Sequence, residues 1–391
     1  MANVIDYVIW RGDLSFSKSK FNYVDVLALS QLTFLDLSDC VVSDGEQTLK
    51  DCAQRYFKDN PDGKPLSFFF PAGLNELFKH VGESKRFSLL KLSNYVRDID
   101  HDSETQFSAM TLDAPKMKTK IVVFSGTDDT FVGWKENFNL IYKGCTNAQK
   151  RAIDYLNDVA QGYDGKIIVL GHSKGGHLSI YASAYCNKEI QDRIIKIYNV
   201  DGPGIPSKEE AQTVYAKLDK KLTTIIPQTS VVGRLFEQGG KLIIAHSEAF
   251  GMPQHDCLTW QVEGAKLVLS EERSPESVGA EACIKEILSN MDAKQREDFV
   301  ETIFQLLFSS GATTFTDLPK KWLAMVGKYF MLAKGQKSAV NGPIAKLFLN
   351  KHLRKCVLDS LKSFKKDKKK ESPNKKKKEP QKIEDKKIDS K

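Results

Sequence analysis

The sequence contains a serine between two glycines, an arrangement that can present a nucleophile. Residues 169–179 read VLGHSKGGHLS, in which Gly171, Ser173 and Gly175 form the pattern Gly-X-Ser-X-Gly. A serine nucleophile stands on a sharp turn between a strand and a helix, where side chains two residues away would collide with the backbone. Glycine is favoured at those positions because it has no Cβ. The pattern predicts nucleophilic attack by Ser173 on a carbonyl carbon.

The five-residue motif is common, so it predicts a nucleophile only when the segments on either side also fit. The apolar run KIIVLG at 166–171 predicts a buried strand, and the small-residue stretch SIYASAY at 179–185 predicts a helix. This order of strand, turn and helix is the one that a nucleophile turn requires. The alternative is an ordinary serine in a glycine-rich loop, and the flanking segments favour the nucleophile.

Attack by a serine on a carbonyl carbon also requires hydrogen-bond donors for the oxyanion that forms on the substrate. One donor is normally the backbone N–H of the residue after the nucleophile, here Lys174, and the other comes from a loop after an earlier strand. The run KIVVFSG at 120–126 predicts that strand, so we expect the second donor at Thr127. The alternative is a plain turn in which Asp128 or Asp129 caps the next helix.

The general base that activates such a serine is most often histidine. Five of the seven histidines are excluded because they lie outside the core pattern or flank the serine: His80, His101, His172, His177 and His352. His246 ends the apolar run KLIIA, where a structural histidine at the end of a strand is the alternative. His255 lies in the loop GMPQHDCLTW, and we favour it because a loop suits a mobile catalytic residue.

The acid that orients the base is expected at the carboxyl edge of a strand, where α/β sites assemble. Asp201 meets this requirement because it follows the predicted strand RIIKIYNV. The order Ser173, Asp201, His255 is then that of α/β-hydrolases. Asp256 and Glu237 remain alternative acids, and the alternative role of Asp201 is to organise the turn DGPGIP.

The elements that must position these residues alternate between strands and helices. A capping-box pair, Thr146 and Gln149, begins a predicted helix between two of the strands. Strands separated by helices predict parallel pairing, so the expected fold is α/β, an α/β-hydrolase-like three-layer fold with a mostly parallel sheet. Apolar runs predict its strands at 120–126, 166–171, 193–200, 222–226 and 241–245.

The pattern changes after the α/β part, where helical segments follow. The run FVETIFQLLF at 299–308 predicts a core-facing helix, and another helix is expected to begin at Pro343. The end of the chain is almost entirely polar and cannot bury a core. The expected organisation is an α/β-hydrolase-like domain at 1–265, a helical appendage at 266–364 and a disordered Lys-rich tail at 365–391.

The formal charge of +8 is confined to the end of the chain. Residues 361–391 contain 14 Lys and 6 acidic residues, which leaves 44 residues of each sign in the first 360. Lysine runs without interleaved aromatic residues give nonspecific attraction to an anionic membrane surface or to nucleic-acid phosphate, so no specific nucleic-acid contact is expected. The alternative is a solvated end that keeps the protein soluble.

Seven cysteines without CxxC spacing argue against a disulfide framework or a zinc site, and no metal or cofactor is expected. The first residues lack the basic and apolar regions of a secretion signal, and no segment approaches the ~18 apolar residues of a membrane span. We therefore expect a cytoplasmic protein, peripheral at a membrane if the tail binds lipid.

Several separated motifs occur together in an order that resembles a known family. They are FSGTDDTFVGWKENFN, GHSKGGHLSIYA, YNVDGPGI, PQTSVVG and PQHDCLTW, preceded by DYVIWRGDLSF. Together they resemble the bacterial Mbeg-like family, which belongs to the α/β-hydrolase superfamily and is distantly related to the class 3 lipases. The resemblance covers roughly residues 1–265.

The resemblance implies a serine hydrolase with Ser173 as nucleophile and His255 as base. It places Thr127 and Lys174 at the oxyanion hole. The implied substrate is an acyl ester, lipid-like by relationship to the lipases, and the implied reaction passes through an acyl-enzyme that water releases.

The sequence departs from the lipase pattern at three places. Class 3 lipases usually have arginine where Ser125 stands and an acid where Asn137 stands. Their catalytic acid follows the next strand, where this chain reads PQTSVVG without a carboxylate, so Asp201 would be a shifted acid. The missing acid favours an alternative function, an inactive hydrolase-fold protein that binds a partner or a membrane. The retained Ser173 and His255 favour the enzyme.

Overall fold

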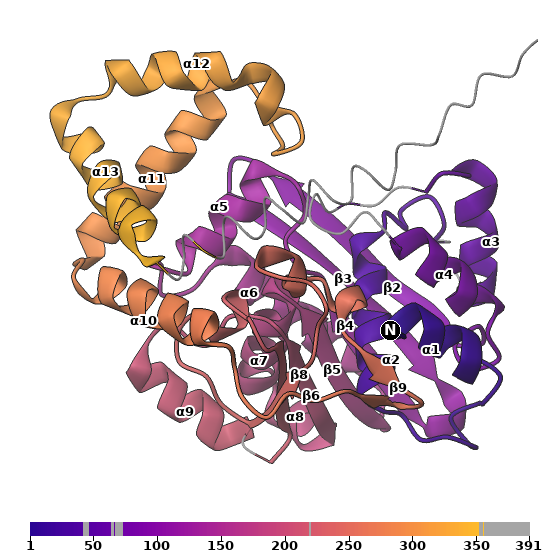
Figure 1. The fold of residues 1–391 in the computed structure, drawn as a ribbon. Helices are drawn as coiled ribbons and strands as arrows, with labels where there is room; N and C mark the ends of the chain where they lie inside the picture. The colour runs from indigo at the N-terminus through magenta and orange to yellow at the C-terminus, as the bar shows by residue number, and fades with distance from the viewer. Residues whose placement is uncertain (42–46, 64–65, 67–72, 219, 352–354, 356–391) are drawn as a thin grey trace, which may run out of the picture.

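The fold is built on a mixed sheet, with an antiparallel half followed by a parallel half. The computed structural model of the chain (Figure 1) describes residues 1–41, 47–63, 66, 73–218, 220–351 and 355. Within these residues one sheet has the strand order β1-β2-β3-β4-β5-β6-β7-β8. Its strands are β1 (Gln47–Thr48), β2 (Lys91–Asp100), β3 (Thr105–Ala114), β4 (Thr119–Phe124), β5 (Lys166–His172), β6 (Ile194–Val200), β7 (Leu222–Pro227) and β8 (Lys241–Ala245).

The second half of the sheet is parallel because helices connect most of its successive strands. Strands β4 to β8 pair in parallel, whereas β1 to β4 pair antiparallel. This arrangement, with helices on both faces, confirms the predicted α/β-hydrolase-like three-layer fold. The connecting helices are α5 (Phe131–Asn139), α6 (Asn147–Ala160), α7 (Lys174–Tyr185), α8 (Lys188–Arg193) and α9 (Lys208–Leu218).

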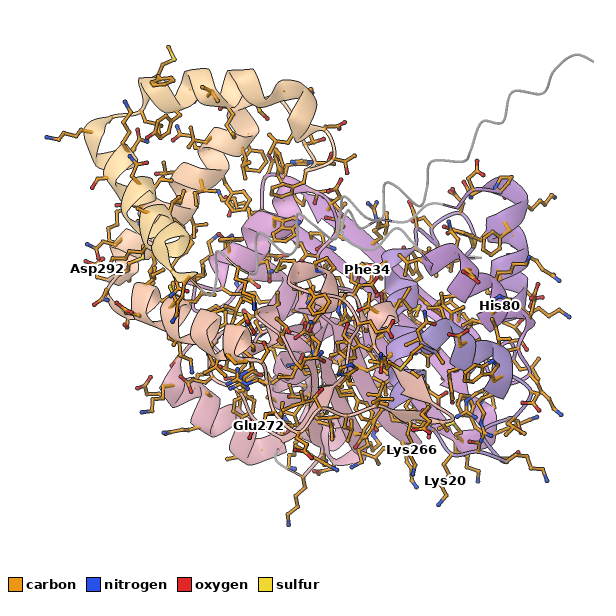
Figure 2. All side chains as sticks on the ribbon, viewed as in Figure 1. Lys20, Phe34, His80, Lys266, Glu272 and Asp292 are labelled. Atoms are coloured by element: carbon orange, nitrogen blue, oxygen red, sulfur yellow. The ribbon has the colours of Figure 1, made fainter. Side chains whose placement is uncertain are left out.

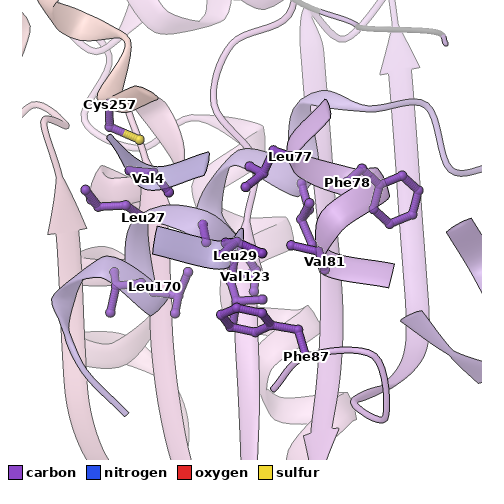
Figure 3. Close-up of a cluster of buried hydrophobic side chains, with 14 of the residues drawn as sticks. Val4, Leu27, Leu29, Leu77, Phe78, Val81, Phe87, Val123, Leu170 and Cys257 are labelled. Atoms are coloured by element: carbon purple, nitrogen blue, oxygen red, sulfur yellow. The ribbon is translucent and has the colours of Figure 1, made fainter. Parts of the chain in front are cut away.

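Both faces of the sheet are buried. In β4, Ile121 and Val123 belong to one apolar cluster, whereas Val122 and Phe124 belong to a second cluster on the opposite face, as the two-residue period of a strand requires. The second cluster contains side chains of α6, α7 and α9. Figure 3 shows part of the first cluster, which contains side chains of α1 (Val4–Arg11), α2 (Tyr23–Gln31), α3 (Leu49–Asp59) and α4 (Leu74–Glu83).

Short elements complete the α/β part. A small antiparallel hairpin pairs β9 (Val262–Glu263) with β10 (Lys266–Leu267). Single turns of 3₁₀ helix lie in the connections, and two of them, η4 and η5, follow the last strand of the main sheet. The turns are η1 (Leu32–Phe34), η2 (Pro115–Met117), η3 (Val232–Arg234), η4 (Met252–His255) and η5 (Cys257–Thr259).

A buried ion pair joins the N-terminal helices. Arg86 Nε donates to Asp25 Oδ1 at 2.6 Å, and Arg86 Nη2 donates to Asp25 Oδ2 at 2.5 Å, with neither side chain exposed. The Tyr7 hydroxyl also donates to Asp25 Oδ1, at 2.8 Å. Arg86 Nη1 donates to the Leu14 carbonyl oxygen at 2.9 Å. The pair thus links α1, α2 and the segment between α4 and β2, whose residues are far apart in the chain.

Helices follow the α/β part in the described C-terminal region. They are α10 (Pro275–Ser289), α11 (Ala293–Ser309), α12 (Leu318–Met331) and α13 (Lys334–Leu349). Phe299 and Phe304 of α11 pack with Trp134 and Phe138 of α5 (Phe131–Asn139), so the expected core-facing helix is confirmed. None of the described helices is both long and apolar enough to cross a lipid bilayer. The segment 365–391 lies outside the described residues.

The expectation that a helix begins at Pro343 is wrong. Helix α13 begins at Lys334, and Pro343 lies inside it. At its start, the side-chain oxygen of Gln336 accepts a hydrogen bond from the Ala333 N–H at 3.2 Å. A proline inside a helix removes one backbone hydrogen bond and crowds the preceding turn. The hydrogen bond at the start of α13 and the packing of this helix stabilise it more than Pro343 destabilises it.

Replacing Arg86 by alanine is expected to lower the free energy of unfolding by about 3–5 kcal/mol, because it leaves the Asp25 carboxylate buried without its charged partner. Urea denaturation followed by circular dichroism measures the change. Lys188→Ala is the matched control, since it removes an exposed ion pair with Asp192 and should change stability little. Equal losses in the two variants would contradict the role given to the buried pair.

Candidate active site

Ser173 occupies a strained turn between a strand and a helix. Strand β5 ends at His172 and helix α7 begins at Lys174, and between them Ser173 has φ 57° and ψ −128°. A residue with a side chain in such a conformation costs about 1–3 kcal/mol, and strain of this kind concentrates at functional sites. The Ser173 N–H donates to the Val200 carbonyl oxygen at 2.9 Å, which ties the turn to the end of β6.

The glycines on either side of Ser173 are required by the backbone around them. A Cβ at Gly171 would lie 2.3 Å from backbone atoms of Gly175. A Cβ at Gly175 would lie 2.1 Å from the Phe124 carbonyl oxygen. Neither position has room for a side chain, so the motif reflects the close approach of β4, β5 and the first turn of α7.

His255 and Asp201 come together beside this turn. His255 Nδ1 lies 2.6 Å from Asp201 Oδ2, although the two residues are 54 positions apart in the chain. With Nδ1 as the donor to the carboxylate, Nε2 of the imidazole is the nitrogen that can accept a proton. Asp201 directly follows β6 and is 1% exposed, and its φ of 46° marks a second strained residue at this edge of the sheet.

The second oxygen of Asp201 is held by the loop that lacks the lipase acid. Ser230 Oγ donates to Asp201 Oδ1 at 2.5 Å, and the Gly233 N–H donates to the same oxygen at 3.1 Å. Both donors lie in PQTSVVG, at 227–233, where the sequence departs from the class 3 pattern. This loop therefore orients the carboxylate of Asp201 and supplies none of its own. Sequence reasoning missed these two donors.

His172, excluded as a base, contacts the candidate base directly. Its Nε2 donates to the His255 carbonyl oxygen at 2.7 Å, and the two imidazole rings lie 4.6 Å apart at 35°. Burial, and to a smaller extent the charge on His255, hold the pKa of His172 well below its usual range. Phe34, labelled in Figure 2, packs edge-on against the His172 ring at 5.5 Å. His172 is thus a neutral support for the turn that carries His255.

Thr127 lies in the loop after β4, as the sequence predicts. It is buried, and its hydroxyl oxygen has no hydrogen-bond partner among the described residues. The helix that follows is capped by Thr130, whose Oγ1 accepts from the Gly133 N–H at 3.0 Å. The alternative that Asp128 or Asp129 caps this helix is therefore wrong. Asp128 instead accepts hydrogen bonds from both the backbone and the hydroxyl of Thr130.

Residues 313–316, which we call the C-terminal strap, cover the segment next to Thr127. The Phe131 N–H donates to the Thr313 carbonyl oxygen at 2.8 Å, and Thr130 and Thr314 form an antiparallel bridge. The Thr316 hydroxyl donates to Asp129 Oδ2 at 2.5 Å. The strap fixes the start of α5 from a part of the chain that lies beyond α11.

The side chain of Lys174 forms a buried ion pair that the sequence reading did not foresee. Lys174 Nζ donates to the backbone and side-chain oxygens of Gln106, each at 2.5 Å, and lies 3.1 Å from Glu136 Oε2. Glu136 also accepts from the N–H groups of Gln106 and Ala148. Glu136 is thus an acidic residue of α5 one position before Asn137, the position at which class 3 lipases usually have an acid. It anchors Lys174, the residue whose N–H was predicted to bind the oxyanion.

The other candidates have structural surroundings of their own. His246 Nδ1 lies 3.3 Å from Ser270 Oγ. The Asp256 carboxylate accepts from the Leu258 N–H, and burial raises the pKa of this carboxyl to about 7. Glu237 forms a backbone bridge with Ile205. Among the residues that the structure describes, no group of three or more His, Cys, Asp or Glu side chains is placed to hold a metal ion.

Together the site contains a serine on a strained turn, an imidazole bonded to a carboxylate, and a buried loop next to the turn. The loop, the serine and the carboxylate follow β4, β5 and β6, where neighbouring parallel strands end side by side, and the imidazole comes from η4. Such a set of groups can activate a hydroxyl for attack on a carbonyl and bind the negative charge that develops.

Comparison with known proteins gives one family match. The model of the Mbeg1-like family matches residues 81–305. No curated protein matches the sequence.

Similar solved structures include lipases of low sequence identity. Lip2 lipase from Yarrowia lipolytica is 14% identical with a TM-score of 0.38, over 66% of this chain and 91% of that one. The lipase–propeptide complex from Rhizomucor miehei is 17% identical with a TM-score of 0.30, over 40% and 57%. The lipase from Rhizopus microsporus var. chinensis is 17% identical with a TM-score of 0.32, over 44% and 64%.

His177, on the first turns of α7, supports the segment after Asp201. It is buried, with Nδ1 3.0 Å from the Gly204 carbonyl oxygen and Nε2 2.8 Å from Gln149 Nε2. A neutral ring satisfies both contacts, donating from Nδ1 and accepting at Nε2. Burial lowers the pKa of His177 from its usual 6.5 to about 4.

Stability should therefore fall as the pH drops from about 6.5 toward 4, because the unfolded chain binds a proton at His177 that the folded chain does not. Between pH 7.5 and pH 5 this group alone should contribute a loss of about 2 kcal/mol. His177→Gln is expected to remove that part of the pH dependence, measured by urea denaturation at the two pH values. His101→Gln, at an exposed turn, should leave it unchanged. His172, whose pKa burial also lowers, should keep its own share of the pH dependence in every variant. The same stability difference between the two pH values in His177→Gln as in the wild type would contradict the assignment.

Proposed function

The chain belongs to the Mbeg1-like family, and on that premise we propose that it is a serine hydrolase that cleaves acyl esters. The observation that carries the proposal is the strained turn at Ser173 beside the hydrogen bond between His255 and Asp201. A positive φ at a serine between two obligatory glycines has no structural benefit of its own, because any L-residue is strained there. The strain has a use if the hydroxyl is a nucleophile.

In the proposed reaction each group has one role. His255 Nε2 takes the proton of the Ser173 hydroxyl as the oxygen attacks the ester carbonyl carbon. Asp201 holds the imidazole by its Nδ1 and stabilises the positive charge that the ring acquires. The imidazolium then gives its proton to the leaving alcohol, and an acyl-enzyme remains. Water, activated by the same imidazole, attacks the acyl-enzyme and releases the acid.

The proposed oxyanion hole consists of the backbone N–H groups of Lys174 and Thr127. The buried contacts of the Lys174 side chain support this role, because they fix the start of α7 before any substrate binds. The contacts of the C-terminal strap fix the segment after Thr127 in the same way. Donors that are already in place cost no reorganisation when charge develops, which is where most electrostatic catalysis originates.

The shifted acid is supported by its own hydrogen bonds. Asp201 follows β6, one strand earlier than the position of the acid in class 3 lipases, yet its carboxylate reaches His255 Nδ1. Ser230 and Gly233 hold its other oxygen from the loop after β7. For its role as the acid, the position of the Asp201 carboxylate in space therefore matters more than the strand that Asp201 follows. These contacts favour an active enzyme over the alternative, an inactive binding protein.

Three substitutions test the roles together. Ser173→Ala and His255→Ala are expected to lower kcat for a short-chain ester by about 10⁶, and Asp201→Asn by about 10⁴ to 10⁵, as in a serine protease triad. Initial rates with 4-nitrophenyl acetate measure these losses, after circular dichroism shows that each variant is folded. Glu237→Gln, at an acid that the structure places in a backbone bridge, should keep the wild-type rate.

A fluorophosphonate probe distinguishes the enzyme from the inactive binding protein. The wild-type chain should be labelled at Ser173, and the Ser173→Ala and His255→Ala variants should not be labelled. A wild-type chain that neither reacts with the probe nor hydrolyses any ester would exclude the proposed activity.

We further propose that the Lys-rich tail at 365–391, outside the described residues, brings the enzyme to anionic lipid. In flotation with phosphatidylserine vesicles the full chain should rise with the lipid at low salt, whereas a chain that ends at residue 364 should not. Each lysine near such a surface contributes about 1 kcal/mol, and salt screens this attraction. Vesicles of phosphatidylcholine are the control. Equal flotation of the two chains would exclude this role of the tail.

A further inference from the structure

An apolar cavity lies between the α/β part and the C-terminal helices. Its volume is about 240 Å³. Its lining residues come from α5 and the turn after it, from α10, α11 and α13, and from the segments after β6 and β7. Side chains that line it include Phe138, Ile141, Leu235, Phe236, Ile284 and Leu288.

Two residues that line the cavity follow, in the chain, residues that contact the turn at Ser173 or its neighbour Lys174. Pro203 lines it, and the residue before Pro203, Gly202, packs so closely on the turn that a Cβ there would lie 2.2 Å from the Ser173 carbonyl oxygen. Asn137 lines it from the other side, and the residue before Asn137 is Glu136, the ion-pair partner of Lys174. Pro203 and Asn137 thus each follow, in the chain, a residue that contacts the turn at Ser173 or its neighbour Lys174.

One wall residue is held in a strained conformation. Phe236 has φ 66°, in the left-handed region that bulky side chains seldom adopt. The backbone on both sides is fixed: the Gly204 N–H donates to the Leu235 carbonyl oxygen at 2.9 Å, and the Glu237 N–H donates to the Ile205 carbonyl oxygen at 3.0 Å. Strain that the surroundings enforce in this way clusters at ligand sites. Here it holds an aromatic ring at the wall of the cavity.

We propose that this cavity binds the acyl chain of the ester substrate. This proposal rests on the proposed hydrolase function, because the ester carbonyl must reach Ser173. The volume exceeds that of a roughly 150 Å³ cavity lined by Leu, Ile and Phe that binds benzene, so several methylene groups fit. An uncharged lining and a position beside the nucleophile turn favour a fatty-acyl chain over a polar substrate group. Each methylene that enters should strengthen binding by about fourfold.

A series of 4-nitrophenyl esters from acetyl to decanoyl tests the cavity. The wild-type kcat/KM should rise with chain length, and Leu288→Trp, which fills the cavity, should lower kcat/KM for the decanoyl ester by about tenfold or more. The acetyl ester should change by less than about twofold, because its acyl group is too short to enter. Ile284→Trp fills the cavity from another position and replaces Leu288→Trp if that variant fails to fold.

Val278→Trp is the matched control, since it adds the same side chain to α10 at a position that is 48% exposed. It should keep the wild-type profile. A flat wild-type profile, or equal effects of Leu288→Trp and Val278→Trp, would overturn the proposal, and retained acetyl ester hydrolysis would leave the hydrolase function standing.

Calorimetric titration of the Ser173→Ala variant with decanoate separates the cavity from catalysis. Binding that the added Leu288→Trp change removes, and the added Val278→Trp change keeps, supports the cavity even if no ester is hydrolysed. Absence of binding in Ser173→Ala, or binding that Leu288→Trp does not weaken, would overturn it. A dimer that dissociates on Leu288→Trp, seen by sedimentation, would assign the cavity to a second copy of the chain and overturn it as well.

Discussion

The site depends on the close contact of three backbone segments around Ser173. Phe124 and Gly171 are paired neighbours in β4 and β5, and the Phe124 carbonyl oxygen occupies the space that a Cβ at Gly175 would need. The Ser173 N–H is bonded to the end of β6. These contacts therefore fix the relative positions of three parts of the site. They are the turn at Ser173, the loop that begins after β4, and Asp201, which follows β6. The bend at Ser173 is the local cost of that arrangement.

The parallel half of the fold could be read from the sequence because its signals are local. Each buried strand contains an apolar run, and α6 begins at a capping box that the structure also contains. The N-terminal helices α1, α2 and α3 also begin at capping boxes, but a capping box does not show how helices pack together. Their packing depends on Asp25 and Arg86, which are 61 residues apart and which meet only after the chain has folded. Pairing of this kind has no local pattern, so neither residue stood out.

The sequence predicts which types of residue form the candidate site and at which edge of the sheet they lie. It does not predict the contacts that hold these residues in place. Asp201 could be proposed from its position after a strand and His255 from its position in a loop, and the structure brings their side chains together. Ser230, Gly233 and Glu136 could not, because each acts through a contact from a different loop or helix. A partial signal was present: Lys174 is a charged residue at the start of a helix whose other residues, His177 apart, are small or apolar, and a buried lysine needs an acidic partner.

The C-terminal strap has a consequence for how such proteins diverge. The shared family sequence ends at residue 305, yet the backbone that bonds to Phe131 comes from Thr313. The part of the chain that the family model matches is therefore shorter than the part that shapes the surroundings of Ser173. Insertions or exchanges beyond residue 305 would reach those surroundings without altering a single residue of the recognised motifs. Two chains with identical motifs and different C-terminal ends would therefore differ in the surroundings of Ser173.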